Sequence, residues 1–110
     1  MILAEIIKKM QLNIFNLSDE NCEITDAYTS DLLSDVMGKA KEGQVWITLQ
    51  THQNVAAIAS LKDLSAIILV NNLKPDADML EYAKENDINV LGTDQNAFQI
   101  SGLLYKILFA

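Results

Sequence analysis

QVWITLQTHQNVAAIASLKDLSAIILV, residues 44–70, is the stretch that decides the fold of this chain. Residues 44–49 and 66–70 are short apolar segments, which is typical of buried strands. Residues 54–62 lie between them and carry apolar side chains at helical spacing. A strand, a helix and a second strand in this order form a right-handed crossover between parallel strands. The stretch therefore predicts an α/β fold with a mostly parallel or mixed sheet.

The sequence outside this stretch continues the alternation of helices and strands. Apolar residues at helical spacing predict a helix over 2–10, and alternating apolar residues predict a short strand over 12–17. We therefore expect about five strands with flanking helices, in a single domain over residues 1–110. The further predicted elements are a loop over 16–23, a strand over 24–28, and helices over 32–40, 75–85 and 96–108, with a strand over 89–91.

The balance of charge and the cysteine content exclude several classes of protein. Fifteen acidic residues outnumber eight basic ones, and the formal net charge of −7 has the wrong sign for binding nucleic acid. The single cysteine, Cys22, cannot form an intrachain disulfide, so nothing requires an oxidising compartment. The longest apolar runs are too short to cross a membrane, and the start lacks the charged leader of a signal peptide. We therefore expect a cytoplasmic protein without a nucleic-acid or membrane partner.

Polar side chains follow four of the predicted strands, at the turns that lead into helices. In open α/β sheets, ligands bind beyond the carboxyl ends of the strands, where these turns lie. Ser, Thr, Asp and Asn also cap helices, and Asn tolerates left-handed backbone geometry, so capping is the favoured alternative for any one turn. A turn can cap a helix and also bind a ligand, because free backbone N–H groups at helix starts attract anions. The candidate ligand-binding residues are Ser30, Asp31, Thr51, His52, Asn54, Asn71, Asn72, Thr93 and Asp94.

His52, the only histidine, permits several interpretations. Its ring at a strand end could contact a phosphate, act as an acid or base, or titrate as a pH switch. A turn histidine satisfied by the backbone is the favoured alternative, and catalysis, with Asp31 or Asp94 orienting the ring, ranks last. There is no second histidine for a zinc site, and the pair Asp31 and Asp35 offers too few carboxylates for a hard cation. We expect no metal and no catalytic residue.

Aromatic residues and glycines add further expectations. Trp46 lies inside a predicted strand and is expected in the core, or at an interface if that face meets a partner. Phe98, Leu104, Tyr105 and Leu108 are expected on the core-facing side of the last helix. The four glycines can form neither a GxGxxG fingerprint nor a P-loop. A P-loop kinase or hydrolase is therefore excluded, and no cofactor is expected.

Four blocks of sequence, in order along nearly the whole chain, resemble the DRTGG domain family. They are TSDLLSDVM (29–37), WITLQTHQNVAAIASL (46–61), AIILVNNLKPD (66–76) and TDQNAFQISGLLYKI (93–107). In particular, the chain is similar to stand-alone DRTGG proteins that resemble the amino-terminal domain of HPr kinase/phosphorylase. The resemblance implies a compact α/β domain with a regulatory or interaction role, which often pairs with itself. It also implies that kinase chemistry belongs to a separate carboxyl-terminal domain.

One departure from the family pattern falls within the candidate site. Where the family commonly has a Thr-Gly-Gly type of turn after the central strand, this sequence has Asn71 and Asn72. Asn can supply the positive φ that Gly would, but its side chain restricts the approach of a ligand to the backbone. The candidate residues that do match the family are Ser30, Asp31, Thr51, His52, Asn54 and Thr93.

Three functions remain open, in decreasing order of support. The first is a non-catalytic regulatory module that binds a small anionic metabolite or nucleotide at the carboxyl edge of the sheet, as a homodimer. The second is an interaction or assembly subunit for a metabolic or redox enzyme, and the resemblance implies iron-only hydrogenase components as one setting. The third is an enzyme that uses His52, for which the sequence offers no demonstrated partner.

Overall fold

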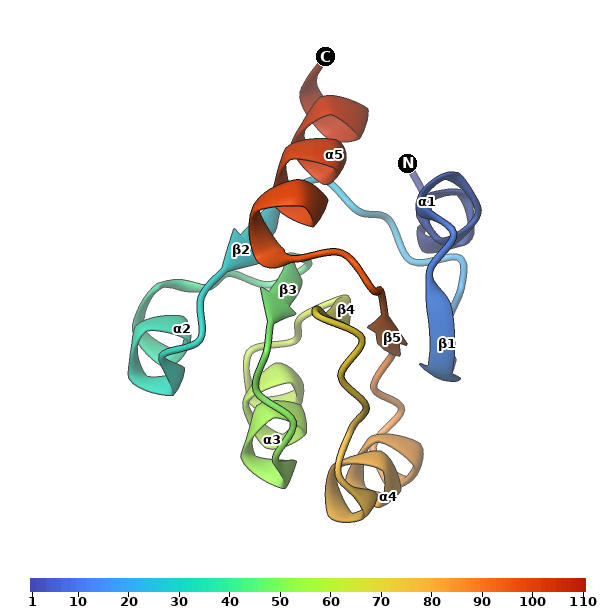
Figure 1. Ribbon diagram of the computed structural model, residues 1–110. Helices are drawn as coiled ribbons and strands as arrows, with labels where there is room; N and C mark the ends of the chain where they lie inside the picture. The colour runs from blue at the N-terminus through green and yellow to red at the C-terminus, as the bar shows by residue number, and fades with distance from the viewer.

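The computed structural model describes residues 1–110 and contains a counterpart, with shifted bounds, for every predicted helix and strand (Figure 1). The prediction of an α/β fold with a sheet of about five strands is therefore confirmed. None of the helices is both long and apolar enough to cross a membrane. The elements are α1 (Leu3–Met10), β1 (Asn13–Asn16), β2 (Ala27–Thr29), α2 (Leu33–Lys39), β3 (Val45–Thr48), α3 (Gln53–Leu61), β4 (Ala66–Leu69), α4 (Ala77–Glu85), β5 (Val90–Gly92) and α5 (Ala97–Phe109).

The sheet is mixed, with strand order β1-β5-β4-β3-β2. Strands β2 to β5 are parallel neighbours in chain order, and β1 pairs antiparallel with β5 at one edge. Because each right-handed crossover leads to the adjacent strand, α2, α3 and α4 cover the same face. Helices α1 and α5 cover the other face (Figure 1). The order of the parallel strands never reverses, so the sheet has no switch point at which a ligand crevice would open.

Two hydrophobic cores form on the two faces of the sheet. Successive side chains of a strand point to opposite faces, so β3 sends Ile47 towards α1 and α5 and Trp46 towards α2, α3 and α4. Strand β4 divides in the same way between Ile68 and Ile67. Both strands are buried throughout, as parallel strands covered on both faces are. The expectation that Trp46 lies in the core is confirmed, because its side chain is fully buried.

Three helices end in the same way, with a residue other than glycine in the left-handed backbone region. Gln11, Asp63 and Asp87 have φ values of 53°, 53° and 57°. The next residue in each case donates its N–H back to the last turn of the helix, as Leu64 does to the Ala59 carbonyl. These tight endings lead directly into the following strands, and they place two aspartates at the amino edge of the sheet.

Two expectations about individual segments are wrong. A strand was expected over 24–28, but Ile24 donates its N–H to the Met1 carbonyl, and the sheet strand begins only at Ala27. Phe98 and Tyr105 were expected to face the core, but they are 88% and 68% exposed, whereas Leu104 is buried as expected. The last helix is apolar on more than one side, so helical spacing alone could not select the buried stripe.

Candidate functional site

The four polar turns lie at one edge of the sheet, because each follows the carboxyl end of a parallel strand. Hydrogen bonds connect each turn to the turn of the neighbouring strand. The first connection joins the turns after β2 and β3 through Asp31. Its Oδ1 accepts the Thr48 hydroxyl at 3.0 Å and the Leu49 N–H at 2.8 Å, and its carbonyl accepts the Gln50 side-chain amide at 3.1 Å. Asp31 therefore fixes the relative position of two turns.

The second connection joins the turns after β3 and β4 through Asp76. The Thr51 hydroxyl donates to one carboxylate oxygen at 3.1 Å, and Nδ1 of His52 lies 3.1 Å from the other. The Asp76 N–H in turn donates to the Thr51 carbonyl. The expected partners of His52, a backbone group or else Asp31 or Asp94, are thus wrong. The ring pairs with a carboxylate 24 residues away and stays 67% exposed.

The third connection joins the turns after β4 and β5 through the backbone of two asparagines. Asn71 and Asn72 have φ values of 59° and 58°, which confirms that asparagine supplies the positive φ here. Their N–H groups donate to the carbonyls of Gln95 and Thr93 at 2.9 and 2.8 Å. Both residues are exposed, and their side-chain amides make no hydrogen bond within the chain. The backbone of this turn is therefore fixed while its side chains remain available.

The turn after β5 is the one that uses side-chain capping. Asn96 and Gln99 form a reciprocal capping box at the start of α5. Thr93 is buried, and its hydroxyl accepts the Gln95 N–H at 3.2 Å. The Gln95 side-chain oxygen is buried without a partner. Helices α2, α3 and α4 begin without a side-chain cap, so capping does not explain the polar residues of the other three turns.

The candidate residues therefore fall into two groups. The side chains of one group make hydrogen bonds that hold the turns in place, either within a turn or to the neighbouring turn. The other group is exposed and makes no side-chain bond, apart from the Nδ1 contact of His52. The exposed group is the part of the edge that a ligand could contact. The first group is Ser30, Asp31, Thr51 and Thr93, and the second is His52, Asn54, Asn71, Asn72 and Asp94.

Asp31 and Asp35, the pair of carboxylates four residues apart, form hydrogen bonds with different partners. Oδ2 of Asp35 accepts the Tyr28 hydroxyl at 2.9 Å, while Asp31 binds Thr48. The Tyr28 hydrogen bond, with a smaller contribution from Ser30, holds the pKa of Asp35 below its ordinary value. No group of three His, Cys, Asp or Glu side chains lies close enough together to hold a metal ion.

The charges at the carboxyl edge are mostly negative. Asp31, Asp76 and Asp94 lie in the turns, against Lys74 and the imidazole ring of His52. A bound phosphate would therefore rely on amide and backbone N–H donors. A divalent cation carried by the phosphate would reduce repulsion from the carboxylates, since Mg²⁺ is commonly bound by one or two carboxylates plus phosphate oxygens.

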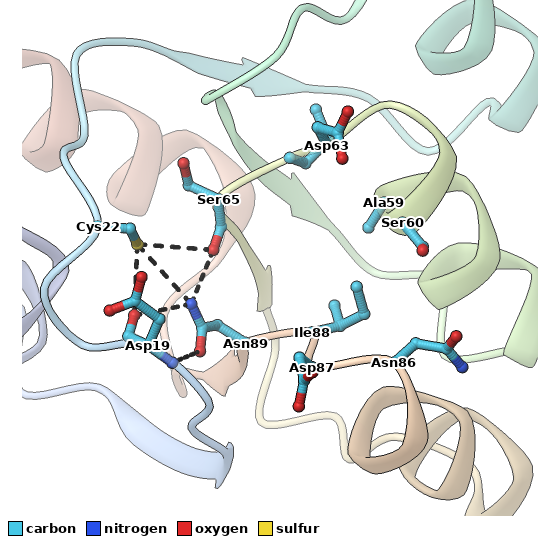
Figure 2. Close-up of a pocket in the computed structure, with 11 residues that line it drawn as sticks. Asp19, Cys22, Ala59, Ser60, Asp63, Ser65, Asn86, Asp87, Ile88 and Asn89 are labelled. Carbon is cyan, nitrogen blue, oxygen red and sulfur yellow. Dashed lines mark hydrogen bonds between the residues drawn. The ribbon is translucent and has the colours of Figure 1, made fainter.

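The largest cavity lies elsewhere, at the amino edge of the sheet, where α3 and α4 end (Figure 2). Its volume is about 300 Å³, and no basic residue lines it. The carboxylates of Asp19, Asp63 and Asp87 and the carbonyl ends of two helices give it a negative potential, which disfavours phosphate. None of its residues was among the candidates from the sequence. The available signals were a polar Asn89 inside a predicted strand and aspartates at the helix ends.

Asn89 organises this cavity (Figure 2). Its side-chain oxygen accepts the N–H groups of Ser18 and Asp19 at 2.8 and 3.0 Å. Its side-chain nitrogen donates to the carbonyls of Asp19 and Ser65 at 3.0 and 2.9 Å. Burial, followed by the Asp19 carboxylate, raises the pKa of the neighbouring Cys22 thiol, so the thiolate is disfavoured. These bonds join a loop to the start of a strand, which is a structural role.

Comparison with known proteins gives a family and a related fold. Residues 27–107 match the DRTGG domain. A similar solved structure is that of the CBS and DRTGG domains of the regulatory region of Clostridium perfringens pyrophosphatase, complexed with its activator diadenosine tetraphosphate. The TM-score is 0.71 at 20% sequence identity, over 94% of this chain and 45% of that chain. This chain thus spans less than half of that structure. No curated protein matches the chain.

Proposed function

Since this chain belongs to the DRTGG domain family, we propose that it is a non-catalytic regulatory module that binds a small anionic metabolite or nucleotide. The proposed site is the carboxyl edge of the sheet, and the proposed active form is a homodimer. The observation that carries the proposal is the set of exposed, unbonded amide side chains of Asn54, Asn71 and Asn72 on an edge whose turns are hydrogen-bonded together. The activator of the similar structure, a dinucleotide polyphosphate, makes nucleotides the first ligand class to test.

The geometry of this edge favours binding without large rearrangement. The hydrogen bonds of Asp31, Asp76 and the Asn71–Asn72 turn fix the backbone before any ligand arrives, which lowers the entropic cost of binding. The first N–H groups of α3 have no partner inside the helix and point towards the edge, where they can donate to a phosphate. Carboxamide side chains can donate to phosphate and also pair with a nucleobase.

A thermal-shift experiment tests this proposal. The purified protein is heated with diadenosine tetraphosphate, ATP, ADP and AMP, each with and without Mg²⁺. A ligand at about 100 times its dissociation constant adds about 2.7 kcal/mol, or roughly 10–20 °C in Tm for a domain of this size. We expect a shift with at least one nucleotide, larger with Mg²⁺. No shift with any of the four would contradict the nucleotide proposal.

Three variants test where the ligand binds. Asn54→Ala removes an exposed amide, and Asn71→Gly with Asn72→Gly removes two more while keeping residues that tolerate positive φ. Asn86→Ala is the matched control, because its exposed side chain lies at the opposite edge. We expect the first two to lose most of the nucleotide-induced shift and the control to keep it. Equal shifts in all variants would mean that the carboxyl edge is the wrong site.

The second candidate function is an assembly subunit for a metabolic or redox enzyme. The similar structure supports it, because there a DRTGG domain occurs together with CBS domains in the regulatory region of an enzyme. A DRTGG domain that contacts an enzyme partner would serve a comparable regulatory role. Crosslinking in cells followed by reconstitution from purified components tests this function. A stoichiometric complex that forms without nucleotide would favour assembly over ligand sensing.

A further inference from the structure

One face of α5 is apolar and exposed, and the proposed ligand site does not use it. Phe98, Tyr105 and Phe109 are 88%, 68% and 54% exposed. Together with Gly102 they occupy one face of the helix, because residues three, four and seven apart share a side. The opposite face of α5 is buried against the sheet through Ile100 and Leu104. Helix α5 therefore has one stripe of side chains in the core and a second stripe in solvent. We call the exposed stripe the α5 face.

A shallow groove adjoins the carboxyl-terminal half of the α5 face. Its volume is about 120 Å³, and it lies between α5 and the edge strand β2. Tyr105, Leu108 and Phe109 form the helix side, and Ala27 and Thr29 form the strand side. A hydrogen bond of 2.8 Å between the hydroxyls of Thr29 and Ser101 holds the two sides together. The groove is thus a preformed, mostly apolar depression beside an exposed aromatic stripe, with the polar side chains of Asp26, Thr29 and Ser101 also in its lining.

We propose that the α5 face is where two copies of this chain pair, with their α5 helices antiparallel about a two-fold axis near Gly102. In this arrangement Phe98 of each copy enters the groove of the other. The helical rise of about 1.5 Å per residue places Phe98 about 6 Å before Gly102 and Leu108 about 9 Å after it. An axis near Gly102 therefore brings Phe98 of one copy to a point about 6 Å after Gly102 of the other, between Tyr105 and Leu108, which both line the groove. This is the self-complementarity that a two-fold dimer requires.

Gly102 lies where the helices would approach most closely. A Cβ atom built at this position would meet no atom within 4 Å, so no part of the same chain covers this side of the helix. The absence of a side chain allows two helix backbones to come near each other. Glycine in the middle of a helix costs about 0.5–1 kcal/mol relative to alanine. Nothing within the single chain requires a glycine here, whereas close contact with a second copy would require one.

Area and charge favour a second copy as the occupant. Aromatic side chains bury about 150–250 Å² each, so the exposed parts of three rings amount to roughly 400 Å² per copy. That is about half of the ~800 Å² that each partner contributes to a stable interface. The walls of the groove and the surface around Gly102 supply further area. Helix α5 contains no Asp or Glu in a chain of net charge −7, so two paired α5 helices place no carboxylates against each other, although Asp26 lines the groove beside them.

The inference names the dimer face of the proposed function and does not depend on nucleotide binding. A monomeric protein that still binds nucleotide would therefore refute the pairing alone. Sedimentation equilibrium on the full chain, from about 1 to about 500 µM, measures the dimer dissociation constant across the range of weak to moderate interfaces. We expect a monomer–dimer equilibrium in this range. A protein that stays monomeric throughout, or that forms open-ended aggregates, would overturn the proposal.

Phe98→Asp and Leu61→Asp form a matched pair of variants. Leu61 is 67% exposed on α3, which covers the opposite face of the sheet, so both substitutions replace an exposed apolar side chain with the same charge. We expect Phe98→Asp to weaken the dimer at least about 30-fold, as loss of a buried aromatic anchor does. Leu61→Asp should leave it unchanged. Equal dimerisation in Phe98→Asp and the parent chain, or equal loss in both variants, would overturn the proposed face.

Two substitutions at Gly102 test the position of the axis. Gly102→Leu should weaken the dimer while raising the Tm of the monomer, because leucine favours the helix and has open space around it. A misfolded variant would instead have a lower Tm. In a Cys22→Ser background, Gly102→Cys should form a disulfide-linked dimer on mild oxidation, since a disulfide requires Cα atoms within about 7 Å. Unchanged affinity in the first variant, or no crosslink in the second, would overturn the axis at Gly102.

Discussion

Replacing Asn89 with alanine tests how the amino edge of the sheet is held together. The side chain is 5% exposed and makes four hydrogen bonds of 2.8–3.0 Å to backbone groups, with a longer one of 3.8 Å to the Cys22 sulfur. Figure 2 shows those that involve Asp19, Ser65 and Cys22. Alanine removes the amide oxygen and nitrogen that connect the loop residues Ser18 and Asp19 to Ser65 at the start of a strand. The substitution leaves backbone donors and acceptors without their partner and adds no new bulk.

The expected cost follows from these four bonds. Each contributes about 0.5–1.5 kcal/mol net, and leaving a buried polar group unsatisfied costs about 1–3 kcal/mol. The adjacent cavity is open enough for water to reach some of the freed groups, which reduces the total. We therefore expect Asn89→Ala to lower the free energy of unfolding by about 2–3 kcal/mol. For a domain of this size that corresponds to a fall in Tm of roughly 10–20 °C.

Urea denaturation followed by tryptophan fluorescence measures this cost. Trp46 is the only tryptophan and is fully buried, so its emission reports unfolding of the core. Asn86→Ala is the control, because this residue lines the same cavity but makes one exposed hydrogen bond, to the Tyr82 carbonyl. It should cost less than about 0.5 kcal/mol. A loss below about 1 kcal/mol for Asn89→Ala, or equal losses for the two variants, would refute the structural role given to Asn89.

Three further predictions concern other parts of the fold. Asp63→Gly and Asp87→Gly should each stabilise the chain by about 0.5–1 kcal/mol in urea denaturation, because glycine adopts the positive φ at these helix ends without steric strain. A loss of stability would mean that the aspartate carboxylates stabilise the fold by more than the backbone strain costs. Gly38→Ala should add about 0.5–1 kcal/mol, since a Cβ there meets nothing within 4 Å, and an unchanged Tm would contradict this. In Tyr28→Phe, an NMR titration should show a higher pKa for Asp35, because the hydroxyl that lowers it is lost. A carboxyl group whose pKa is lower in the folded than in the unfolded state stabilises the fold at pH values above its unfolded-state pKa. This contribution is lost as the pH falls through the folded-state pKa, so the variant, in which it is smaller, should lose less stability on acidification. An unchanged Asp35 pKa would exclude Tyr28 as the cause.

The alternation of strands and helices could be predicted from the sequence because it is recorded in local periodicity. The buried strands around Trp46 and Ile68 are short apolar runs, and the helices between them carry apolar residues at helical spacing. Local periodicity does not indicate that β1 runs antiparallel to β5, because this pairing depends on packing across the whole sheet. The two exposed aromatics of α5 were assigned to the wrong side because that helix has two apolar stripes.

The candidate site could be predicted in outline but not in its contacts. The positions of the polar turns follow from the strand ends, and the positive φ of Asn71 and Asn72 follows from the chemistry of asparagine. The pairing of His52 with Asp76 spans 24 residues and depends on which strands are neighbours. The cavity around Asn89 likewise depends on the tertiary fold, because its walls come from segments up to 71 residues apart in the sequence. Neither could be read from local spacing.

Mapping of nucleotide contacts by NMR tests the central proposal most directly. Backbone amide spectra of the full chain are recorded during titration with diadenosine tetraphosphate in the presence of Mg²⁺. The proposed function predicts saturable shifts at Asn54, at Asn71 and Asn72, and at Asp94, which together outline the carboxyl edge of the sheet. Shifts confined to the amino-edge cavity around Asp63 and Asp87, or a spectrum unchanged at millimolar nucleotide, would contradict it.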